Sequence, residues 1–296
     1  MSTLRYQRSF GERAVDVFLY IFLAVVAFTA VFPFIHLFVL SLNEAEDAMR
    51  GGLYFFPRKF TLYNYEFVFS HPQLLTATFN SVARTVLQTV ISVFCNGMVA
   101  YALSRREFIY RRLFSFLLVL TMYVNGGLIP TYLLIKGLGL MNTFAVYIVP
   151  GILSAFYIMV MRSFFEQLPD GLVESGYMDG AGDFRIYSTL ILPISLPVLA
   201  CIALFVAVSE WNQWFDNFLY NNRNPKLAVL QYEMQKLLDS VTIPEDLESV
   251  DPSERRMTPY VIKATLTMVV TIPIMMVYPF LQRYFVQGLT LGAMKG

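Results

Sequence analysis

Charged residues are scarce in this sequence. Lys, Arg, Asp and Glu together make up 15% of the 296 residues, whereas about a quarter of a typical soluble domain is charged. Hydrophobic residues make up 56%, and the mean hydropathy is +0.55. This composition excludes an ordinary soluble domain and predicts a chain whose main solvent is lipid. The net charge of +1 supplies no basic surface for nucleic acid, so we expect no such partner.

Cysteine and histidine are almost absent, with two residues of each. Cys95 and Cys201 lie in apolar runs, which favours small buried hydrophobic residues over a disulfide. His36 and His71 are too far apart for zinc-ligand spacing, so we expect no metal site. No segment carries Gly-x4-Gly-Lys followed by Ser or Thr, the pattern of a phosphate-binding loop. The sequence therefore predicts no catalytic residues and no cofactor in this chain.

Long apolar runs dominate the chain instead. A membrane-spanning helix needs about 20 mostly apolar residues. Six stretches satisfy this requirement: 14–40, 81–103, 113–135, 144–161, 190–208 and 260–281. The last two contain Pro193, Pro197, Pro273 and Pro279, which predict kinks that a membrane tolerates. We therefore predict an all-α membrane protein with six transmembrane helices, in which residues 14–296 form a single transmembrane domain.

Basic residues in short loops predict the orientation, because Lys and Arg are held on the cytoplasmic side. They gather in four segments: 1–13, 105–112, 162–185 and 283–295. The first apolar run is too long for the core of a cleavable signal peptide, so we expect it to remain as an anchor. Both termini are thus predicted to be cytoplasmic, and the long segments 41–80 and 209–259 are predicted to lie outside.

The cytoplasmic loop at residues 166–190 carries the most specific pattern. Pro169 is suited to the first position of a helix, and such a helix would place Leu172, Val173, Gly176 and Tyr177 on one stripe. Gly180 and Gly182 can turn with positive φ, and Asp183 can cap a second helix. The expected structure is helix, glycine turn, helix, shaped to dock in a groove of another protein. A loop packed on the protein's own surface would show the same periodicity.

The order of residues in this loop decides between those alternatives. Glu174-Ser175-Gly176, three residues, Gly180, nine residues and then Leu190-Ile191-Leu192-Pro193 resembles the "EAA" signature of ABC importer permeases. Ser175 and Gly176 stand where that signature has alanines, and Leu190 stands where it has isoleucine. Phe79-Asn80-Ser81, residues 125–132 and residues 282–296 are similar to the smaller permease of maltose-type carbohydrate importers, especially its polysaccharide and alginate branch.

The resemblance implies the type I ABC importer permease fold in a bacterial inner membrane, with several partners. These are a second, larger permease, two ATPase subunits that bind ATP and Mg, an external solute-binding protein and an oligosaccharide. The ATPase-coupling residues would be Leu172, Val173, Glu174, Ser175, Gly176, Tyr177, Asp179, Gly180, Ala181 and Gly182. The cytoplasmic tail, 282–296, would reach the ATPase interface through Gln287, Gly288, Gly292 and Lys295.

Polar and aromatic residues near the spans are candidates for the substrate path, because sugars need both hydrogen bonds and apolar faces. The candidates are Asn96, Tyr123, Asn125, Glu210, Trp211, Asn212, Gln213 and Trp214. Each also has a structural alternative: Asn96 and Asn125 could join helices, and the tryptophans could anchor at the interface.

Two other functions fit parts of the pattern. The loop signature is shared by importers of peptides, amino acids and anions, so the cargo could be a non-sugar solute. An ion-coupled secondary transporter would work without an ATPase, but spans two to five contain no Asp or Glu to relay protons. Asp16 in the first span fits the membrane interface. A membrane-embedded enzyme lacks paired carboxylates or a Ser–His arrangement near a membrane face.

Overall fold

The computed structural model describes residues 10–70, 72–241 and 258–293. They form helices joined by turns and loops, with a single antiparallel β-bridge between Asn43 and Phe60 among the described residues. They divide into two compact units. Unit 1 comprises residues up to 70 together with 241–269, and unit 2 comprises residues 71–240 together with 270–296. Helix α13 (Pro259–Ala293) contributes to both units.

Unit 1 contains the first long helix and a short polar excursion after it. α1 (Phe10–Ser41) is followed by α2 (Ala45–Ala48) and α3 (Tyr63–Ser70). Val39, Leu40 and Leu53 pack with Val261 of α13 in a small core. The most apolar stretch of α1 has no buried side chain, so lipid or a partner must cover it.

A polar network fixes the excursion after α1. The amide of Asn43 donates to a carboxylate oxygen of Asp47 at 3.1 Å, and Arg58 donates to the same oxygen at 2.9 Å. Asn64 donates to the carbonyls of Ser41 and Asn43, both at 2.9 Å. His36 in α1 lies 3.2 Å from the hydroxyl of Tyr260, within hydrogen-bonding distance.

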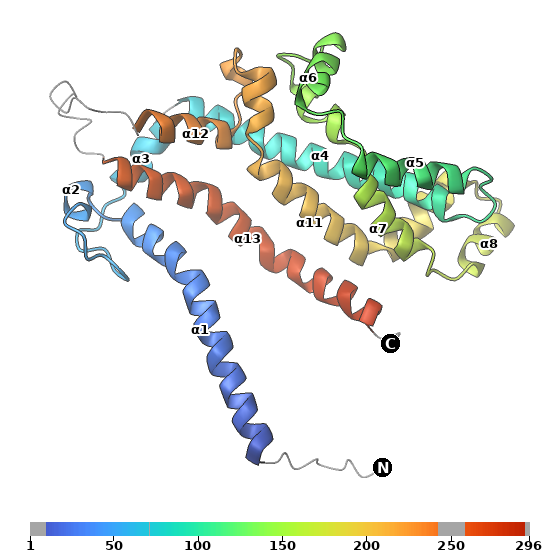
Figure 1. Cartoon of the computed structure of the whole chain (residues 1–296), viewed down its shortest axis with the longest axis horizontal. Coiled ribbons are helices and arrows are strands. Elements are labelled where there is room, and N and C mark those ends of the chain that lie inside the picture. The colour runs from blue at the N-terminus through green and yellow to red at the C-terminus, as the bar shows by residue number, and fades with distance from the viewer. Residues whose placement is uncertain (1–9, 71, 242–257, 294–296) are drawn as a thin grey trace. The chain divides into compact units, whose positions relative to one another are not determined.

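Unit 2 is built around α4 (Pro72–Ser104), which packs mainly against α7 (Ala155–Phe165) and α11 (Leu196–Asn212). Its core includes Ile158, Ile191 and Ile202, all fully buried. The remaining elements are α5 (Arg111–Tyr123), α6 (Leu128–Gly137), η1 (Phe144–Tyr147), η2 (Val149–Gly151), α8 (Gly171–Met178), α9 (Asp183–Ile186), η3 (Tyr187–Ile191), α10 (Leu192–Ile194), η4 (Asn217–Asn221), η5 (Pro225–Leu227) and α12 (Leu230–Val241). Figure 1 shows α7 and α11 crossing α4.

The helices long and apolar enough to cross a membrane are α1, α4 and α13 among the described residues, and three bent pairs bring the number to six if each pair is one span. α9–α10 and α11 meet at 86°, between Pro193 and Pro197, as the prolines predicted. By contrast, Pro273 and Pro279 lie inside the continuous α13.

The sharpest bend falls where no proline predicted one. α5 and α6 form an angle of 117°, and the connection is Asn125-Gly126-Gly127. Gly127 has φ +84°, a backbone conformation that glycine adopts without strain. The side-chain oxygen of Asn125 accepts the N–H of Gly127 at 2.8 Å. The segment 113–135, expected as one span, is therefore two helices around a glycine turn.

Candidate functional site

The loop after α7 folds as two short helices around a glycine, as the spacing predicted. α8 begins at Gly171, two residues after Pro169, and ends at Met178. Gly180 has φ +75°, a conformation that other residues adopt only with strain. Gly182 has φ −79° and precedes α9, whose first residue is Asp183. The expectations of a positive φ at Gly182 and of a helix cap from the Asp183 side chain were therefore wrong.

α8 buries one narrow stripe and exposes the rest. Val173 and Gly176 are buried, and Leu172 is half-buried. Tyr177 was expected on the same stripe, but 48% of its surface is exposed, as is 88% of Met178. The exposed residues are Glu174, Ser175, Tyr177, Met178, Asp179 and Gly180, while Ala181 is half-buried. The loop thus presents an acidic and apolar outer face on a firmly packed base.

Gly176 is where α8 and α9 touch. A β-carbon added at Gly176 would lie 2.9 Å from Cγ1 of Ile186 and 3.2 Å from Cδ1 of Leu190. Ile186 is fully buried, so it cannot move away freely. The glycine at this alanine position is therefore explained by packing: it lets Ile186 approach the helix closely.

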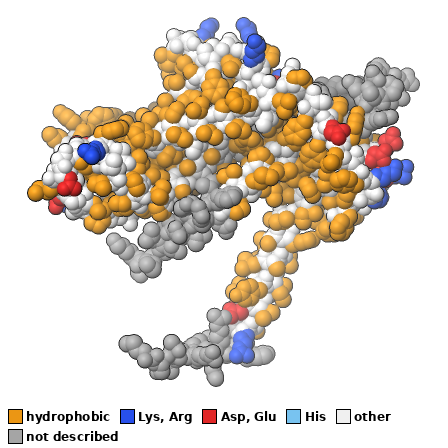
Figure 2. Space-filling model, turned by 180° about the vertical axis from the view of Figure 1, so that it is seen from behind, with side chains coloured by type: hydrophobic (Ala, Val, Ile, Leu, Met, Phe, Trp, Pro, Cys, Tyr) orange, Lys and Arg blue, Asp and Glu red, His pale blue; other side chains and the backbone are white. Residues whose placement is uncertain are grey.

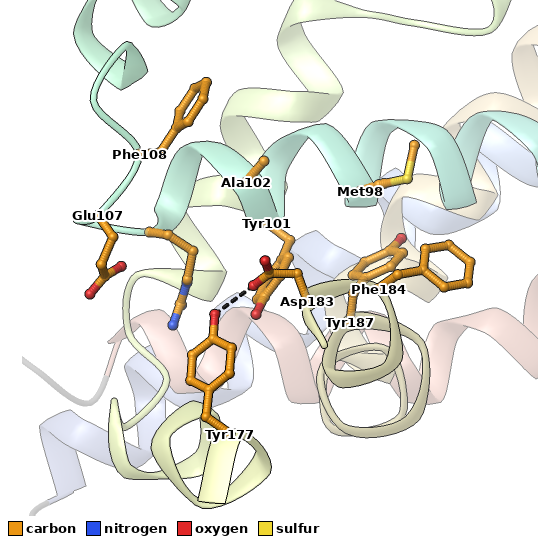
Figure 3. A pocket seen from close by; sticks show the side chains of 10 residues that line it. Met98, Tyr101, Ala102, Glu107, Phe108, Tyr177, Asp183, Phe184 and Tyr187 are labelled. Atoms are coloured by element: carbon orange, nitrogen blue, oxygen red, sulfur yellow. Dashed lines mark hydrogen bonds between the residues drawn. The ribbon is translucent and has the colours of Figure 1, made fainter. Parts of the chain in front are cut away.

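A pocket of about 430 Å³ lies between this loop and the end of α4. Tyr177 donates a hydrogen bond to Asp183 across the mouth at 2.5 Å (Figure 3). This bond to a carboxylate raises the pKa of Tyr177 to about 12. Deeper in the pocket, Tyr187 stacks on Tyr101 at 5.7 Å, and Arg105 lies over the Tyr101 ring at 5.1 Å. The loop is thereby tied to α4 through aromatic side chains.

A buried ion cluster lies near the other end of α4. Arg84, of which 1% is exposed, pairs with Glu210 of α11 and with Asp216 at N–O distances of 2.7 Å each. Its guanidinium also lies 4.6 Å from the centre of the Tyr147 ring. Two carboxylates against one guanidinium leave a formal charge of −1 in the cluster. Such a cluster is stable only because each charge is held by hydrogen bonds.

Side-chain hydrogen bonds from α4 hold the segment that follows α11. The amide of Asn80 donates to the carbonyls of Lys226 and Ala228, both at 2.8 Å. The hydroxyl of Ser81 accepts the N–H of Leu230 at 2.8 Å. The Asn-Ser pair at the start of the predicted second span, inside α4, therefore fixes a chain segment about 150 positions later.

Both the amide nitrogen and the amide oxygen of Asn96 are hydrogen-bonded inside the protein. Its amide donates to the backbone of Ser92 at 2.6 Å and to that of Ile152 at 2.8 Å, and its oxygen accepts the N–H of Ser154 at 2.8 Å. The residue is fully buried. Asn96 thus joins α4 to the start of α7, which is the structural alternative considered for it. Tyr123 is 84% exposed, and Asn125 belongs to the glycine turn.

The group from Glu210 to Trp214 does not form one surface. Glu210 forms an ion pair with Arg84. The Trp211 indole donates a hydrogen bond to the carbonyl of Val270 at 3.1 Å, and only 9% of this tryptophan is exposed. Trp214 instead contacts the ring of Phe215 edge-to-face and the ring of Phe218 at a tilt. Asn212 and Gln213 are exposed. The neighbours separate because a helix turns successive side chains toward different sides up to Asn212, and the chain then leaves the helix in an extended conformation at Gln213.

Comparison with known proteins identifies this arrangement. A family profile described as "Binding-protein-dependent transport system inner membrane component" matches residues 88–215, which include the loop and, of the ion cluster, Glu210. The polygalacturonan/rhamnogalacturonan transport system permease protein YtcP of Bacillus subtilis is 36% identical over 289 residues, which cover 96% of this chain and 99% of the relative. This chain belongs to the binding-protein-dependent transport permeases.

Other members of the family are similar over nearly the whole length. The arabinooligosaccharides transport system permease protein AraQ of Halalkalibacterium halodurans is 31% identical, covering 92% of this chain and 94% of the relative. A chain of a bacterial ABC transporter involved in the import of the acidic polysaccharide alginate superposes with a TM-score of 0.85 at 27% identity, covering 94% of this chain and 99% of that one. The predicted type I importer permease fold is confirmed.

The predicted tail residues fall outside the described side chains, and one residue of the ion cluster was not predicted. Gln287, Gly288 and Gly292 lie in the last turns of α13, where side chains are outside the described part, and Lys295 lies outside the described residues. Arg84 is central to the cluster and was missed. An arginine inside an apolar span is costly and marks a function or a partner, so its position alone was a usable signal.

Proposed function

We propose that this permease imports an oligosaccharide across a bacterial inner membrane, driven by ATP hydrolysis in separate subunits. The observation that carries this proposal is the loop of α8, Gly180 and α9. A buried base at Val173 and Gly176 holds an outer face on which Glu174 and Met178 are exposed. A loop of this kind transmits a rigid-body motion between a partner protein and the spans, because its close packing keeps it from deforming.

The loop faces the cytoplasm in this proposal and docks into a groove on an ATPase subunit. Met178 supplies an apolar contact and Glu174 a charge. Two such ATPases bind ATP and Mg, and a second, larger permease forms the other half of the pathway. The tail from Gln287 to Lys295 adds to the ATPase interface. Both termini then lie in the cytoplasm, and six spans cross the membrane.

An external solute-binding protein delivers the sugar to segments 41–80 and 209–259. The network of Asn43, Asp47 and Arg58 supports this assignment, because a preformed polar surface binds with less loss of entropy. The sugar class is supported by relatives named for arabinooligosaccharides and for polygalacturonan. Tyr123, Asn125, Asn212 and Gln213 remain candidates for the substrate path, since they are exposed; Asn96, Glu210 and Trp211 have structural roles.

The test is co-expression with the genomic neighbours, followed by purification and ATPase assay with and without the sugar-loaded binding protein. We expect an ATPase and a second permease to co-purify. Glu174→Ala and Gly180→Trp should each lose the stimulation by the binding protein while the thermal stability of this chain is kept. Arg106→Ala is the control, because Arg106 is an exposed charge that lies outside the loop and outside the two segments assigned to the binding protein.

Two outcomes would contradict the proposal. A chain that purifies alone and transports solute under an ion gradient is a secondary carrier. A complex whose ATPase is stimulated by a peptide or an amino acid, and by no oligosaccharide, is an importer of another cargo.

A further inference from the structure

A second pocket, distinct from the coupling loop, opens beside the end of α6. It has a volume of about 490 Å³, within the range of about 300–1,000 Å³ that small-molecule sites occupy. It is formed by the last turns of α6, the turn at residues 139–142 and the segment 219–223 that includes most of η4. Figure 1 shows α6 and the segment after α11 projecting on the same side of α4.

The charge of this pocket has one sign. Lys136 and Arg223 line it and are both exposed. Neither forms an ion pair with a described residue, and no Asp or Glu lines the pocket. Figure 2 shows basic side chains, without acidic ones, at the upper edge of the view. Two uncompensated cations attract an anion, and a guanidinium binds a carboxylate in a two-point geometry.

The pocket also has an aromatic wall. The rings of Tyr132 and Tyr220 stack at 6.1 Å with an interplanar angle of 20°. Tyr220 is buried, whereas Tyr132 is half-buried. The buried Tyr220 therefore holds the pair in place, and the ring of Tyr132 stays partly accessible. A flat apolar ring face matches the C–H face of a sugar ring, which a simple inorganic anion lacks.

Amide groups complete the lining, and the backbone that carries them is held in place. Asn142 has φ +55°, an uncommon conformation for a residue other than glycine. Its N–H donates to the carbonyl of Tyr220 at 3.1 Å, and Asn221 donates to the carbonyl of Thr143 at 3.1 Å. Both bonds connect the two walls. Asn142 and Asn222 therefore offer hydroxyl-binding groups on a preorganised frame, where strained residues often mark function.

We infer that this pocket binds a sugar carboxylate, that is, a uronate residue of an oligosaccharide. Lys136 and Arg223 pair with the carboxylate, Tyr132 covers a ring face, and the two amides bind hydroxyl groups. This inference rests on the proposed import function, since it specifies the charge of the cargo. The site would hold the sugar before it enters the pathway between the spans.

The test measures direct binding to the complete importer complex in nanodiscs, in the absence of the solute-binding protein. The probe is trigalacturonate, with maltotriose as the uncharged control and inorganic phosphate as a competing anion. We expect trigalacturonate to bind more tightly than maltotriose, with an affinity that falls as salt rises. Lys136→Gln and Arg223→Gln should each raise its Kd by about tenfold, since each removes a charge-assisted bond.

The controls separate this site from general charge and from folding. Lys226→Gln removes an exposed cation of the same segment that does not line the pocket, and it should leave the Kd unchanged. Tyr132→Ala should weaken trigalacturonate binding without changing its salt dependence. The melting temperature of each variant complex, measured in parallel, should stay at the wild-type value.

Three results would overturn the inference. Equal binding of trigalacturonate and maltotriose removes the role of charge. Equal displacement by phosphate indicates an anion site without sugar specificity. Variants that weaken docking of the solute-binding protein, while the trigalacturonate Kd is unchanged, assign the pocket to a carboxylate of that protein.

Import assays in proteoliposomes separate failure of this inference from failure of the proposed function. A complex that imports no oligosaccharide contradicts the proposed function, whereas one that imports only neutral sugars contradicts this inference alone.

Discussion

Arg84 of α4 and Asp216, which follows α11, lie 132 positions apart in the sequence and meet in a two-point ion pair with N–O distances of 2.7 and 3.2 Å. Glu210 binds the same guanidinium at 2.7 Å. The pairing ties the start of the second predicted span to the end of the fifth. It also holds the segment after α11 against the helix core, where an unpaired charge would destabilise the fold.

The first prediction concerns this cluster. Arg84→Met leaves Glu210 and Asp216 without their cation and should destabilise the chain by about 3–5 kcal/mol. The triple variant Arg84→Met, Glu210→Gln, Asp216→Asn should recover much of that loss, because no unpaired charge remains. Thermal unfolding in detergent measures both, with the exposed Arg106→Met as control. A triple variant no more stable than Arg84→Met would mean that the cluster does not act through charge.

The contact between Gly176 and Ile186 gives a prediction with a definite sign. Gly176→Ala should raise helix propensity by up to about 1 kcal/mol, yet the new methyl group would overlap the buried Ile186. We expect the steric term to dominate and the ATPase activity of the complex to lose its response to the binding protein. Combining Gly176→Ala with Ile186→Ala should cost less than the sum of the two single changes. Strict additivity, measured by thermal unfolding, would exclude the contact.

The phenol of Tyr177 should lose its proton at an unusually high pH. Its hydrogen bond to the carboxylate of Asp183 raises its pKa to about 12, above the ordinary value of about 10. A raised pKa means that the bond stabilises the loop fully below pH 10 and that this contribution is lost as pH rises from about 10 to 12. The difference in phenolate absorbance between wild type and Tyr177→Phe should have its midpoint near 12.

Asp183→Asn removes the acceptor carboxylate and should lower this midpoint toward the ordinary value of about 10, although burial of the phenol continues to raise the pKa. Asp179→Asn removes a carboxylate of the same loop that makes no bond to Tyr177, and should leave it unchanged. An unshifted midpoint in Asp183→Asn would show that the bond does not form in solution.

The excursion after α1 should weaken in acid. The hydrogen bond from Asn43, assisted by Arg58, lowers the pKa of Asp47. A lowered pKa in the folded state means that this stabilisation is present above the unfolded value of about 3.9 and is lost as pH falls through the folded value. Hydrogen exchange of residues 42–61 should therefore accelerate below about pH 4, beyond the intrinsic effect of pH. Asp47→Asn should remove this dependence, whereas Glu44→Gln should retain it.

The sequence predicted the structure of the loop at residues 166–190 well because its determinants are local. Residues 166–190 encode a helix, a glycine turn and a second helix at fixed spacing, and only the exposure of Tyr177 and the geometry of Gly182 and Asp183 differ. The apolar runs also coincide with the three helices long and apolar enough to cross a membrane and with the three bent pairs, since length and hydropathy can be read from the sequence. The glycine turn at residues 125–127 was not predicted as a bend, although Gly126-Gly127 inside an apolar run was the available signal.

The ion cluster and the basic pocket could not be obtained in the same way. Glu210 was considered for the substrate path because its immediate neighbours are polar and aromatic. Its actual partner, Arg84, lies 126 positions earlier, and pattern reading along the chain does not report which distant residues meet. The same holds for Lys136 and Arg223, which the bend after α5 and the turn at Asn142 bring to one pocket.

The Arg84–Glu210 pair also has a consequence for the synthesis of the protein and its insertion into the membrane. A ribosome adds about 5–20 residues per second, so the 126 positions between the two residues take roughly 6–25 s to synthesise. During that interval α4 carries its guanidinium without a counter-ion. Lateral release of α4 into lipid would then be penalised, which favours its retention beside the insertion machinery until α11 emerges and joins the membrane with it.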